Sequence, residues 1–577
     1  MMADRAATSA ASVSPASRLR RSHHALVRLR AHGPAAAVGL ALGLLALGPG
    51  LARGFLLSYD MVFVPDPPFS AALLGGSGGP ARAVPSDAAI TVAARVLPAD
   101  IVQKIVLLLI FMLACSGAAA LLAAGWGGVT GRRAPTLACL VSGVFYTWNP
   151  FVAERLLIGQ WALLLGFAGL PWVLREASTG PVRLKAWRLM LVMLPAAVGG
   201  FAALTLTGLA AAPAALARGT GRERAGRLAV VLGALLVLSL PWLIPSLLVP
   251  VHTDPRGVDL FGAHADTPFG RLGSLILLSG IWNAQTVPRG YGGAASAFWL
   301  IVVGCALAGY VLQARARRMT VGLGLAGLIG LAVAAIGISS PTRAVLREAV
   351  AAWPGFAVLR DGQQFVAALG LMEAVGLGAA VAWLLARAVA SPAKGTEAGR
   401  RPEPAAVAVA VLTLLAPVVL LPGMVWGMAG RLRPTEYPAD WLTARSLLDA
   451  SKQPGSVLLL PWGAYRRYSW NHGEAVYDPW NKFLTRRVIS NDGLQAGSRT
   501  LTQESAAAIQ MNRILTARGP LTAQLRAVGV RYVIIDAGPL LTEQISRLAA
   551  AARLPGAQVV RASRDLIVCV IPTSAAG

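Results

Sequence analysis

The chain has 577 residues, of which 55% are hydrophobic and only 14% are charged, with a formal net charge of +26 and a mean hydropathy of +0.61. About a quarter of the residues of a soluble domain are charged, so this composition excludes an ordinary soluble globular protein. Apolar runs of roughly 17–25 residues recur along the chain, and such runs predict transmembrane helices rather than buried core helices. The sequence therefore predicts a polytopic α-helical membrane protein.

The first part of the chain combines a basic tail with an apolar run. Residues 1–33 are rich in arginine, and the apolar run follows at about residues 34–52. Small residues close this run, so it also fits a signal peptide. The long basic lead favours a retained first transmembrane helix, which we expect to start on the cytoplasmic side.

Further spans follow, and together they make about eleven. The run at 187–217 is too long for one comfortable span, and Gly199-Gly200 offers a turn within it, so we divide it in two. Residues 272–281 are apolar but too short to span, and we expect them to be re-entrant or interfacial. The later spans lie at about residues 101–124, 135–150, 157–175, 187–201, 203–217, 228–250, 295–313, 320–338, 366–388 and 405–428.

Lysine and arginine favour cytoplasmic loops, so their distribution predicts the orientation. With the N-terminus inside, the inside segments carry several basic residues for each acidic one, whereas the outer membrane loops carry both in near balance. This pattern accounts for most of the basic excess near the membrane, and nucleic-acid binding is not needed to explain it. The inside segments are the tail and the loops near residues 132, 183, 222, 317 and 394.

The predicted organisation has three parts: a cytoplasmic tail (1–33), a membrane domain (34–430) with a long outer loop at 53–100, and an outer domain (431–577). An odd number of spans places the last part outside the cytoplasm. It is expected to form a small α/β domain, because short apolar runs typical of buried strands alternate with helical patterns. The strands are expected at 456–460, 531–536 and 566–571, the helices at 501–517 and 541–553, and a polar linker at 391–404.

Polar residues gather in four outer loops. The first contains Asp60, Asp66 and Asp87, and the others include the stretches 145–161, 252–289 and 353–364. Arginine binds phosphate through two parallel hydrogen bonds, and a carboxylate can act as a general base. The set therefore suits a substrate with an anionic head group and a lipid tail, although solvated loop charges are the alternative. The candidate substrate-binding residues are Asn149, Glu154, Arg155, Gln160, Asp254, Arg256, Arg360, Asp361 and Gln364.

Other signals are weaker. Glu373 lies inside the span at 366–388, and an intramembrane carboxylate usually faces a cavity or a partner group. The cysteines and histidines show no disulfide or metal-ligand spacing, so we expect no cofactor, with a divalent metal left open. No Walker motif is present, which argues against an ATP-driven pump. The aromatic and polar cluster at 465–482 suits sugar binding or a packed domain edge.

This layout resembles the GT-C superfamily of membrane glycosyltransferases, which use polyprenyl-phosphate sugars. Tyr59-Asp60-Met61 and the segments 149–160 and 354–364 are similar to actinobacterial membrane proteins of the arabinofuranosyl- and mannosyltransferase type. Arginine-rich, lysine-poor usage also fits a bacterium with a high-GC genome. The implied partners are the lipid bilayer, a polyprenyl-phosphate-linked sugar and a cell-envelope glycan acceptor.

The resemblance implies an inverting transfer at the outer face of the plasma membrane. A carboxylate of the first loop deprotonates a sugar hydroxyl, which attacks the anomeric carbon while polyprenyl phosphate leaves. Asp60 is the implied base, with Asp66 and Asp87 as alternatives, because the adjacent acids of many family members are absent here. Arg155 and Arg360 are implied phosphate clamps, and Gln160 is an implied head-group contact.

Two other functions stay open on the sequence. A transporter or flippase of lipid-linked intermediates would depend on charges near the middle of the membrane, notably Glu373, and not on the first loop. A scaffold of an envelope assembly would depend on the outer domain at 431–577, and not on single charges of the membrane part.

Overall fold

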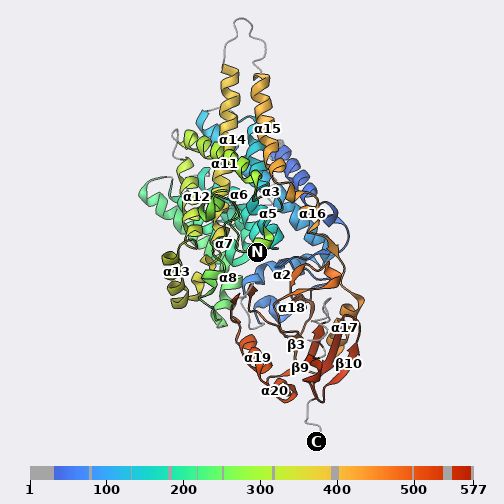
Figure 1. Cartoon of the computed structure of the whole chain (residues 1–577). Helices are drawn as coiled ribbons and strands as arrows, with labels where there is room; N and C mark the ends of the chain where they lie inside the picture. Colours follow the sequence, from blue (N-terminus) through green and yellow to red (C-terminus); the bar gives the residue numbers. More distant parts are fainter. Residues whose placement is uncertain are drawn as a thin grey trace, which may run out of the picture.

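The computed structural model describes residues 32–76, 81–130, 133–179, 185–217, 219–249, 252–314, 319–390, 402–496, 499–536, 547 and 549–572. They form an elongated molecule with a helical bundle at one end and a mixed sheet at the other (Figure 1). Most of the basic tail and of the linker at 391–404, and about half of the helix expected at 541–553, lie outside these residues.

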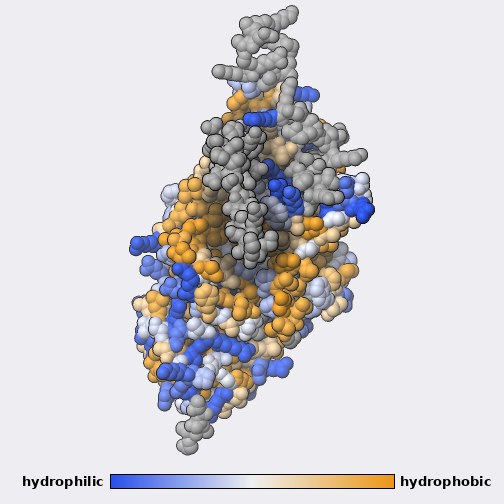
Figure 2. Space-filling view, turned by 180° about the vertical axis from the view of Figure 1, so that it is seen from behind, coloured by the Kyte–Doolittle hydropathy of each residue, from blue (hydrophilic) through white to orange (hydrophobic). Residues whose placement is uncertain are grey.

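The helical part is apolar on its outside. Large hydrophobic side chains such as Leu236, Ile301 and Leu412 are exposed there, and Figure 2 shows broad hydrophobic surface over the helices. After a first helix, His32–Leu51, the helices are α2 (Val84–Ala93), α3 (Ala99–Thr130), α4 (Thr136–Thr147), α5 (Pro150–Leu157), α6 (Trp161–Thr179), α7 (Ala186–Leu216), α8 (Gly221–Leu248), α9 (Gly257–Leu260), α10 (Gly270–Ile276), α11 (Ala294–Ala314), α12 (Met319–Ala335), α13 (Ser340–Ala352), α14 (Ala367–Ala390), α15 (Pro404–Leu420) and α16 (Val425–Gly430).

Helix α14 is the centre of the bundle, because nearly all residues from Gly362 to Ala382 are buried. Its glycines allow neighbouring backbones to come close. A Cβ atom at Gly376 would lie 2.1 Å from the carbonyl oxygen of Ala306 in α11, and one at Gly378 would lie 2.9 Å from that of Ala138 in α4. Small residues at helix crossings are the usual device for close packing in membrane bundles.

Among the described residues, seven helices are long and apolar enough to cross a membrane, or up to nine if each of two bent pairs is one span. The predicted number of about eleven is therefore not confirmed. One difference is α6, which was predicted as the span at 157–175 and is not among these seven. The other is α7, which counts as one long helix where two spans were predicted.

Helix α7 is folded back on itself at the predicted turn. Gly200 has a φ angle of 77°, outside the helical range. Leu189 and Ala211 belong to one apolar cluster, although a straight helix would hold them about 33 Å apart at about 1.5 Å per residue. The chain therefore reverses at Gly199-Gly200, as the sequence predicts, and two helical halves lie side by side.

Two predicted spans are bent in the structure. Val321–Ala335 meets Ser340–Ala352 at an angle of 92°, and Pro404–Leu420 meets Pro422–Gly430 at 62°. The segment predicted to be re-entrant or interfacial, 272–281, contains the end of the short helix α10. Its residues Leu275, Leu277 and Leu278 are completely buried in the main core, so this segment packs inside the protein.

The region after α16 contains a five-stranded sheet in the order β10-β11-β9-β3-β6. β3 pairs in parallel with β9 and β6, whereas β11 pairs antiparallel with β9 and β10. The three predicted strands are present as β3, β9 and β11. The elements of this region are α17 (Ala439–Ala450), β3 (Ser456–Leu460), β4 (Tyr465–Arg467), β5 (Ala475–Tyr477), α18 (Trp480–Phe483), β6 (Val488–Ile489), β7 (Gln495–Ala496), β8 (Arg499–Thr500), α19 (Ala506–Thr516), α20 (Thr522–Ala527), β9 (Val530–Asp536), β10 (Gln558–Ala562) and β11 (Leu566–Val570).

Strands β3 and β9, in the middle of the sheet, are buried on both faces, and successive side chains of each strand point to opposite faces. Leu458 joins Met511 of α19 and Leu525 of α20 in one cluster. Val457 and Tyr532 face the other side and belong to the same core cluster as the membrane helices. The sheet and the helical bundle therefore share a continuous apolar core.

The first outer loop is fastened to this C-terminal region. Phe55 and Leu56 form β1, which pairs with β2 (Pro434–Thr435). The backbone of Tyr59 donates to the carbonyl of Ala475 and accepts from the amide of Tyr477. Figure 1 shows α2, which lies within this loop, beside α18 of the C-terminal region. The predicted loop at 53–100 is thus held by the end of the chain as well as by the helices.

Candidate active site

The site begins with the short helix α5 and the turn that follows it. Asn149 caps α5, because its side-chain oxygen accepts from the amide of Val152 while its nitrogen donates to the carbonyls of Phe145 and Tyr146. The helix ends at Gly159, whose φ angle of 82° favours glycine. This turn sets the direction of Gln160.

Gly159 also brings the first outer loop close. A Cβ atom at this position would lie 2.2 Å from both the Met61 amide nitrogen and the Ser58 carbonyl oxygen. The amide of Asp60 donates to the carbonyl of Ile158 at 3.0 Å, and the Ser58 hydroxyl donates to the carbonyl of Leu157 at 2.6 Å. These backbone contacts place Asp60 directly beside Gln160.

The side chain of Asp60 receives two hydrogen bonds. The hydroxyl of Tyr465 donates to one carboxylate oxygen at 2.5 Å, and the amide nitrogen of Gln160 reaches the other at 3.5 Å. One acid is thus held between the first loop, the turn after α5 and strand β4 of the C-terminal region.

A polar chain leads from Asp60 into the membrane domain. The amide oxygen of Gln160 accepts from Arg155 at 2.5 Å, and Arg155 makes two parallel bonds to Asp361 at 2.6 and 3.0 Å. Arg155 also donates to Gln363 at 2.9 Å, and Gln363 donates to Glu154 at 3.1 Å. The sequence thus predicts five members of this connected group: Asp60, Glu154, Arg155, Gln160 and Asp361.

The surroundings of Asp60 favour its protonated form. The residue is exposed on one side, but protein atoms surround the rest of its carboxyl group, and this partial desolvation raises the pKa of the Asp60 carboxyl above its usual range. The hydrogen bonds from Tyr465 and Gln160 act in the opposite direction, and the nearby charge of Asp361 adds to the rise. A carboxylate whose charge is costly is a better proton acceptor than one in water.

A cavity of about 550 Å³ adjoins this carboxylate. Four aromatic residues line it, and two of them, Tyr59 and Tyr465, are the chain neighbour and the hydrogen-bond donor of Asp60; the others are Trp282 and Trp462. Polar groups that suit hydroxyls are also present, including Asn283, Gln285 and Arg467. Rings with flanking amides and a guanidinium suit a carbohydrate.

Comparisons with known proteins address the fold. No family model matches the sequence, and no curated protein matches it. The mycobacterial arabinofuranosyltransferase AftD is similar in structure, with a TM-score of 0.56 at 17% identity over 94% of this chain and 40% of that one. The chain has the GT-C fold. It spans 40% of the length of the AftD chain that it matches.

Two further solved structures are similar. A mutant of AftD matches this chain with a TM-score of 0.56 at 17% identity, over 94% of this chain and 41% of that one. The archaeal oligosaccharyltransferase AglB from Archaeoglobus fulgidus, in complex with an inhibitory peptide and a dolichol-phosphate, matches with a TM-score of 0.43 at 11% identity. That match covers 88% of this chain and 69% of the AglB chain.

The two arginines with an implied role as phosphate clamps are both paired in the structure. Arg155 is completely buried, and it donates hydrogen bonds to Asp361, Gln160 and Gln363. Arg360 forms an ion pair with Glu504 at 3.2 Å and lies over the ring of Phe261. Arg155 therefore positions other residues of the site, and Arg360 joins the outer loop to the C-terminal region.

The alternative acids lie apart from the Asp60 group. Asp87 forms an ion pair with Lys482 at 2.7 Å, which joins α2 to α18. Asp66 is exposed, and its carbonyl accepts from Arg445 of α17. Neither side chain takes part in the connected group around Arg155, so the structure brings only Asp60 of the three acids to this group.

Five other predicted residues lie outside the connected group. Asn149 caps α5, as described. Asp254 accepts from the amide of Arg256 and from Thr502, and Gln364 donates to the carbonyl of Val358. The side chain of Arg256 lines a different cavity. Glu373 is completely buried in α14, and neither of its carboxylate oxygens has a hydrogen-bond partner among the described residues.

Gln363 is the site residue that the sequence did not predict. It lies next to the predicted Gln364 in a 3-10 segment, Gly362–Val366, where neighbouring side chains diverge by about 120°. Only Gln363 points to Arg155. The adjacent amides are a signal for this position, but choosing between them requires the start of the segment.

The aromatic cluster predicted to bind sugar is divided in the structure. Tyr465, Arg466 and Arg467 line the cavity, whereas Tyr468 and Trp480 are buried against Trp441. The cluster therefore supplies both a cavity wall and a packed domain edge. Among the described residues, no group of three or more His, Cys, Asp or Glu has the arrangement of a metal site.

Proposed function

We propose that this chain is a glycosyltransferase that moves a sugar from a polyprenyl-phosphate donor to a cell-envelope glycan. The transfer would take place at the outer face of the plasma membrane. The observation that carries the proposal is the position of Asp60, a carboxylate that Tyr465 and Gln160 hold beside an aromatic cavity of about 550 Å³ within a GT-C fold.

In the proposed step, Asp60 accepts the proton of an acceptor hydroxyl. The hydroxyl oxygen attacks the anomeric carbon of the donor sugar as its bond to the phosphate oxygen breaks, so the configuration inverts. Tyr465 and Gln160 hold the carboxylate, and Arg155 acts through Gln160 as a positioning residue. Gln160 can take only one orientation here, because its oxygen accepts from Arg155.

The cavity is proposed to bind the sugars. Trp282, Trp462 and Tyr59 offer ring faces, and Asn283 and Gln285 offer amides for hydroxyl groups. Arg467 is the exposed cation of this cavity and is proposed to meet the donor phosphate, since Arg155 and Arg360 are each paired with an acid. A guanidinium suits a phosphate because it offers parallel donors.

The test measures release of polyprenyl phosphate by the purified chain in lipid. Extracted polyprenyl-phosphate sugars serve as donors and an envelope glycan serves as the acceptor. Asp60→Asn should lower turnover by about 10²–10⁴-fold, the usual contribution of a general base. Asp66→Asn is the matched control, because its side chain lies outside the Asp60 group, and it should keep wild-type turnover.

Turnover by Asp60→Asn equal to that of the wild type would exclude Asp60 as the base. No turnover by folded wild-type protein with any donor would argue for transport or scaffolding instead. The anomeric configuration of the product decides between inversion and retention, and a chelator decides whether a divalent cation takes part.

A further inference from the structure

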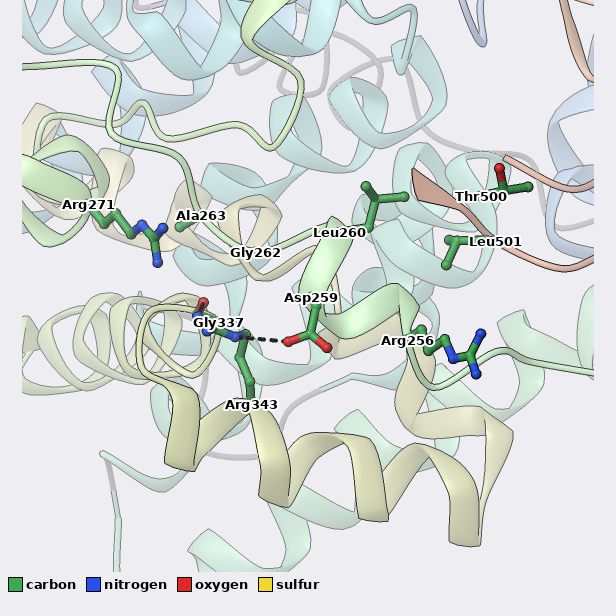
Figure 3. Close-up of a pocket in the computed structure, with 10 residues that line it drawn as sticks. All are labelled: Arg256, Asp259, Leu260, Gly262, Ala263, Arg271, Gly337, Arg343, Thr500 and Leu501. Atoms are coloured by element: carbon green, nitrogen blue, oxygen red, sulfur yellow. Dashed lines mark hydrogen bonds and ion pairs between the residues drawn. The ribbon is translucent and has the colours of Figure 1, made fainter. Parts of the chain in front are cut away.

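A second cavity, of about 490 Å³, lies at the bend between α12 and α13. Figure 3 shows the residues that line it, which come from the segment around α9, from α10, from the bend and from β8. No residue that the structure describes lines both this cavity and the aromatic cavity beside Asp60. The proposed glycosyl transfer leaves this second cavity without a role.

The charged residues of this cavity are mainly arginines. Arg256, Arg271 and Arg343 line it, and Asp259 is the acid among the described lining residues. Asp259 accepts from Arg343 at 3.1 Å and from Arg347 at 3.0 Å, so two guanidinium groups share its single charge. Figure 3 shows Arg271 and Arg256 on opposite sides of the ion pair between Asp259 and Arg343.

Arg256 and Arg271 give the cavity a surplus of positive charge. Neither has an acidic partner among the residues that the structure describes, although Arg271 donates to the carbonyl of Ile338 at 3.2 Å. Both side chains are exposed. An anionic ligand could therefore displace water from them without breaking an ion pair.

The cavity lies where the apolar helix α12 ends and α13 begins, and the two helices run in different directions. The bend of 92° sets α13 across the axis of α12, which is the geometry of a helix in the plane of a membrane surface. Leu272 and Val345 are exposed apolar neighbours of the lining arginines, and Trp353, which follows α13, is 60% exposed. Tryptophan is enriched at the level of lipid head groups.

We propose that this cavity binds the phosphate group of a membrane lipid. Arg256 and Arg271 would contact the phosphate, and the acyl chains would lie on the apolar surface that includes Leu272 and Val345. Basic pockets at the ends of membrane helices bind lipid head groups in this way. The inference goes beyond glycosyl transfer and does not depend on it, because binding is measured without turnover.

The probe is phosphatidic acid, in nanodiscs that otherwise contain phosphatidylcholine, and the full chain is used. Retained phosphatidic acid is counted by native mass spectrometry after release from the disc. The double variant Arg256→Gln/Arg271→Gln should bind the lipid at least about tenfold more weakly, as loss of two head-group arginines predicts. Arg347→Gln is the matched control, because Arg347 pairs with Asp259 without lining the cavity, and it should bind like the wild type.

Soluble phosphate is the other source of the same chemical group, so inorganic phosphate is added as a competitor. Lipid binding that millimolar inorganic phosphate does not displace, and that the double variant lacks, supports the proposal. Displacement by inorganic phosphate would overturn the lipid assignment. Equal retention by the wild type and the double variant would show that the arginines only fasten the bend.

Arg271 also contacts the bend, so the double variant has a folding control. The single variant Arg256→Gln removes a side chain with no hydrogen bond or ion pair among the described residues. It should unfold at the wild-type temperature and still bind phosphatidic acid severalfold more weakly. Wild-type affinity in this folded variant would equally overturn the proposal.

Discussion

At the scale of single residues, Tyr465 links the proposed base to the C-terminal region. Its hydroxyl donates to Asp60 at 2.5 Å, and its ring lines the aromatic cavity. The hydrogen bond stabilises the charged carboxylate and opposes the burial that raises the pKa of Asp60. The same side chain therefore helps to set both the shape of the cavity and the pH at which the base becomes active.

Tyr465→Phe should move the acidic limb of the activity profile to higher pH. A general base works only when it is deprotonated, so activity is lost as the pH falls through the pKa of Asp60. Removing a hydrogen bond to the charged form raises that pKa further. The measurement is kcat/KM for polyprenyl-phosphate release against pH. Tyr477→Phe is the control, because the Tyr477 ring packs on Tyr465 and makes no hydrogen bond to Asp60 among the described residues. An unchanged acidic limb in Tyr465→Phe would contradict the assignment.

Individual site residues could be predicted from the sequence only where a charged residue stands out in an apolar chain. Asp60, Arg155 and Asp361 stand out because charges are scarce, and the structure brings them into one group. Their roles depend on partners far away in the sequence: Arg360 could not be assigned to Glu504, since 144 residues separate them. Side-chain direction in a 3-10 segment was equally hidden, which is why Gln363 was not predicted.

At the scale of elements, the hairpin in α7 depends on a backbone conformation that glycine adopts easily. Gly200→Ala should destabilise the protein by roughly 1–2 kcal/mol, because the φ angle of 77° is strained for a residue with a Cβ atom. Gly233→Ala in α8 is the control, since a Cβ atom there meets nothing within 4 Å and alanine favours the helix. Thermal unfolding in detergent should show a loss for the first variant and none for the second.

The C-terminal region contains a buried group of two acids and one arginine. Arg466 contacts Asp478 at 2.6 Å and Asp536 at 3.1 Å, and all three are almost completely buried. Burial raises the pKa of Asp536 to about 7, and the charge of Asp478 adds to this while Arg466 opposes it. One positive charge thus serves two carboxyl groups, and Asp536 keeps its proton near neutral pH.

This proton links the stability of the fold to pH. The unfolded chain releases the proton of Asp536 near pH 4, as an ordinary aspartic acid does, whereas the folded chain keeps it up to about pH 7. The folded state binds more protons in this window, so stability falls as the pH rises, by on the order of 1 kcal/mol per pH unit. Asp536→Asn should make this slope shallower in thermal unfolding between pH 5 and 7. The exposed acid Asp449 provides the control variant Asp449→Asn, which should keep the slope.

Helices, strands and turns could be predicted where a run of apolar residues or a pair of glycines determines them. The strands β3, β9 and β11 follow from short runs of apolar residues, and the turn of α7 follows from Gly199-Gly200. The angles of 92° and 62° were not predictable, because they depend on packing between helices; the first bend lies at the end of the predicted span 320–338 and the second within the predicted span 405–428. The burial of the segment around Leu277 was not predictable either, because this segment is too short to span a membrane and yet lies in the core.

At the scale of the whole molecule, the first outer loop and the C-terminal region form one unit with the bundle. β1 pairs with β2, Asp87 pairs with Lys482, and one apolar core runs from the membrane helices into the sheet. Tyr465 and Asp60 can therefore meet although 405 residues separate them. The proposed active site exists only in the assembled molecule, so the first loop and the sheet must lie on the same side of the membrane.

The proposed orientation places that side outside the cytoplasm. Arginine-rich segments such as the loop before α8 are then inside, as the positive-inside rule requires. In a variant without the four native cysteines, Thr443→Cys in α17 should react with a membrane-impermeant maleimide in intact cells. Thr220→Cys, at the start of α8, should react only after the membrane is permeabilised. Labelling in the reverse order would place Asp60 in the cytoplasm, and the donor would then have to be bound at the inner face.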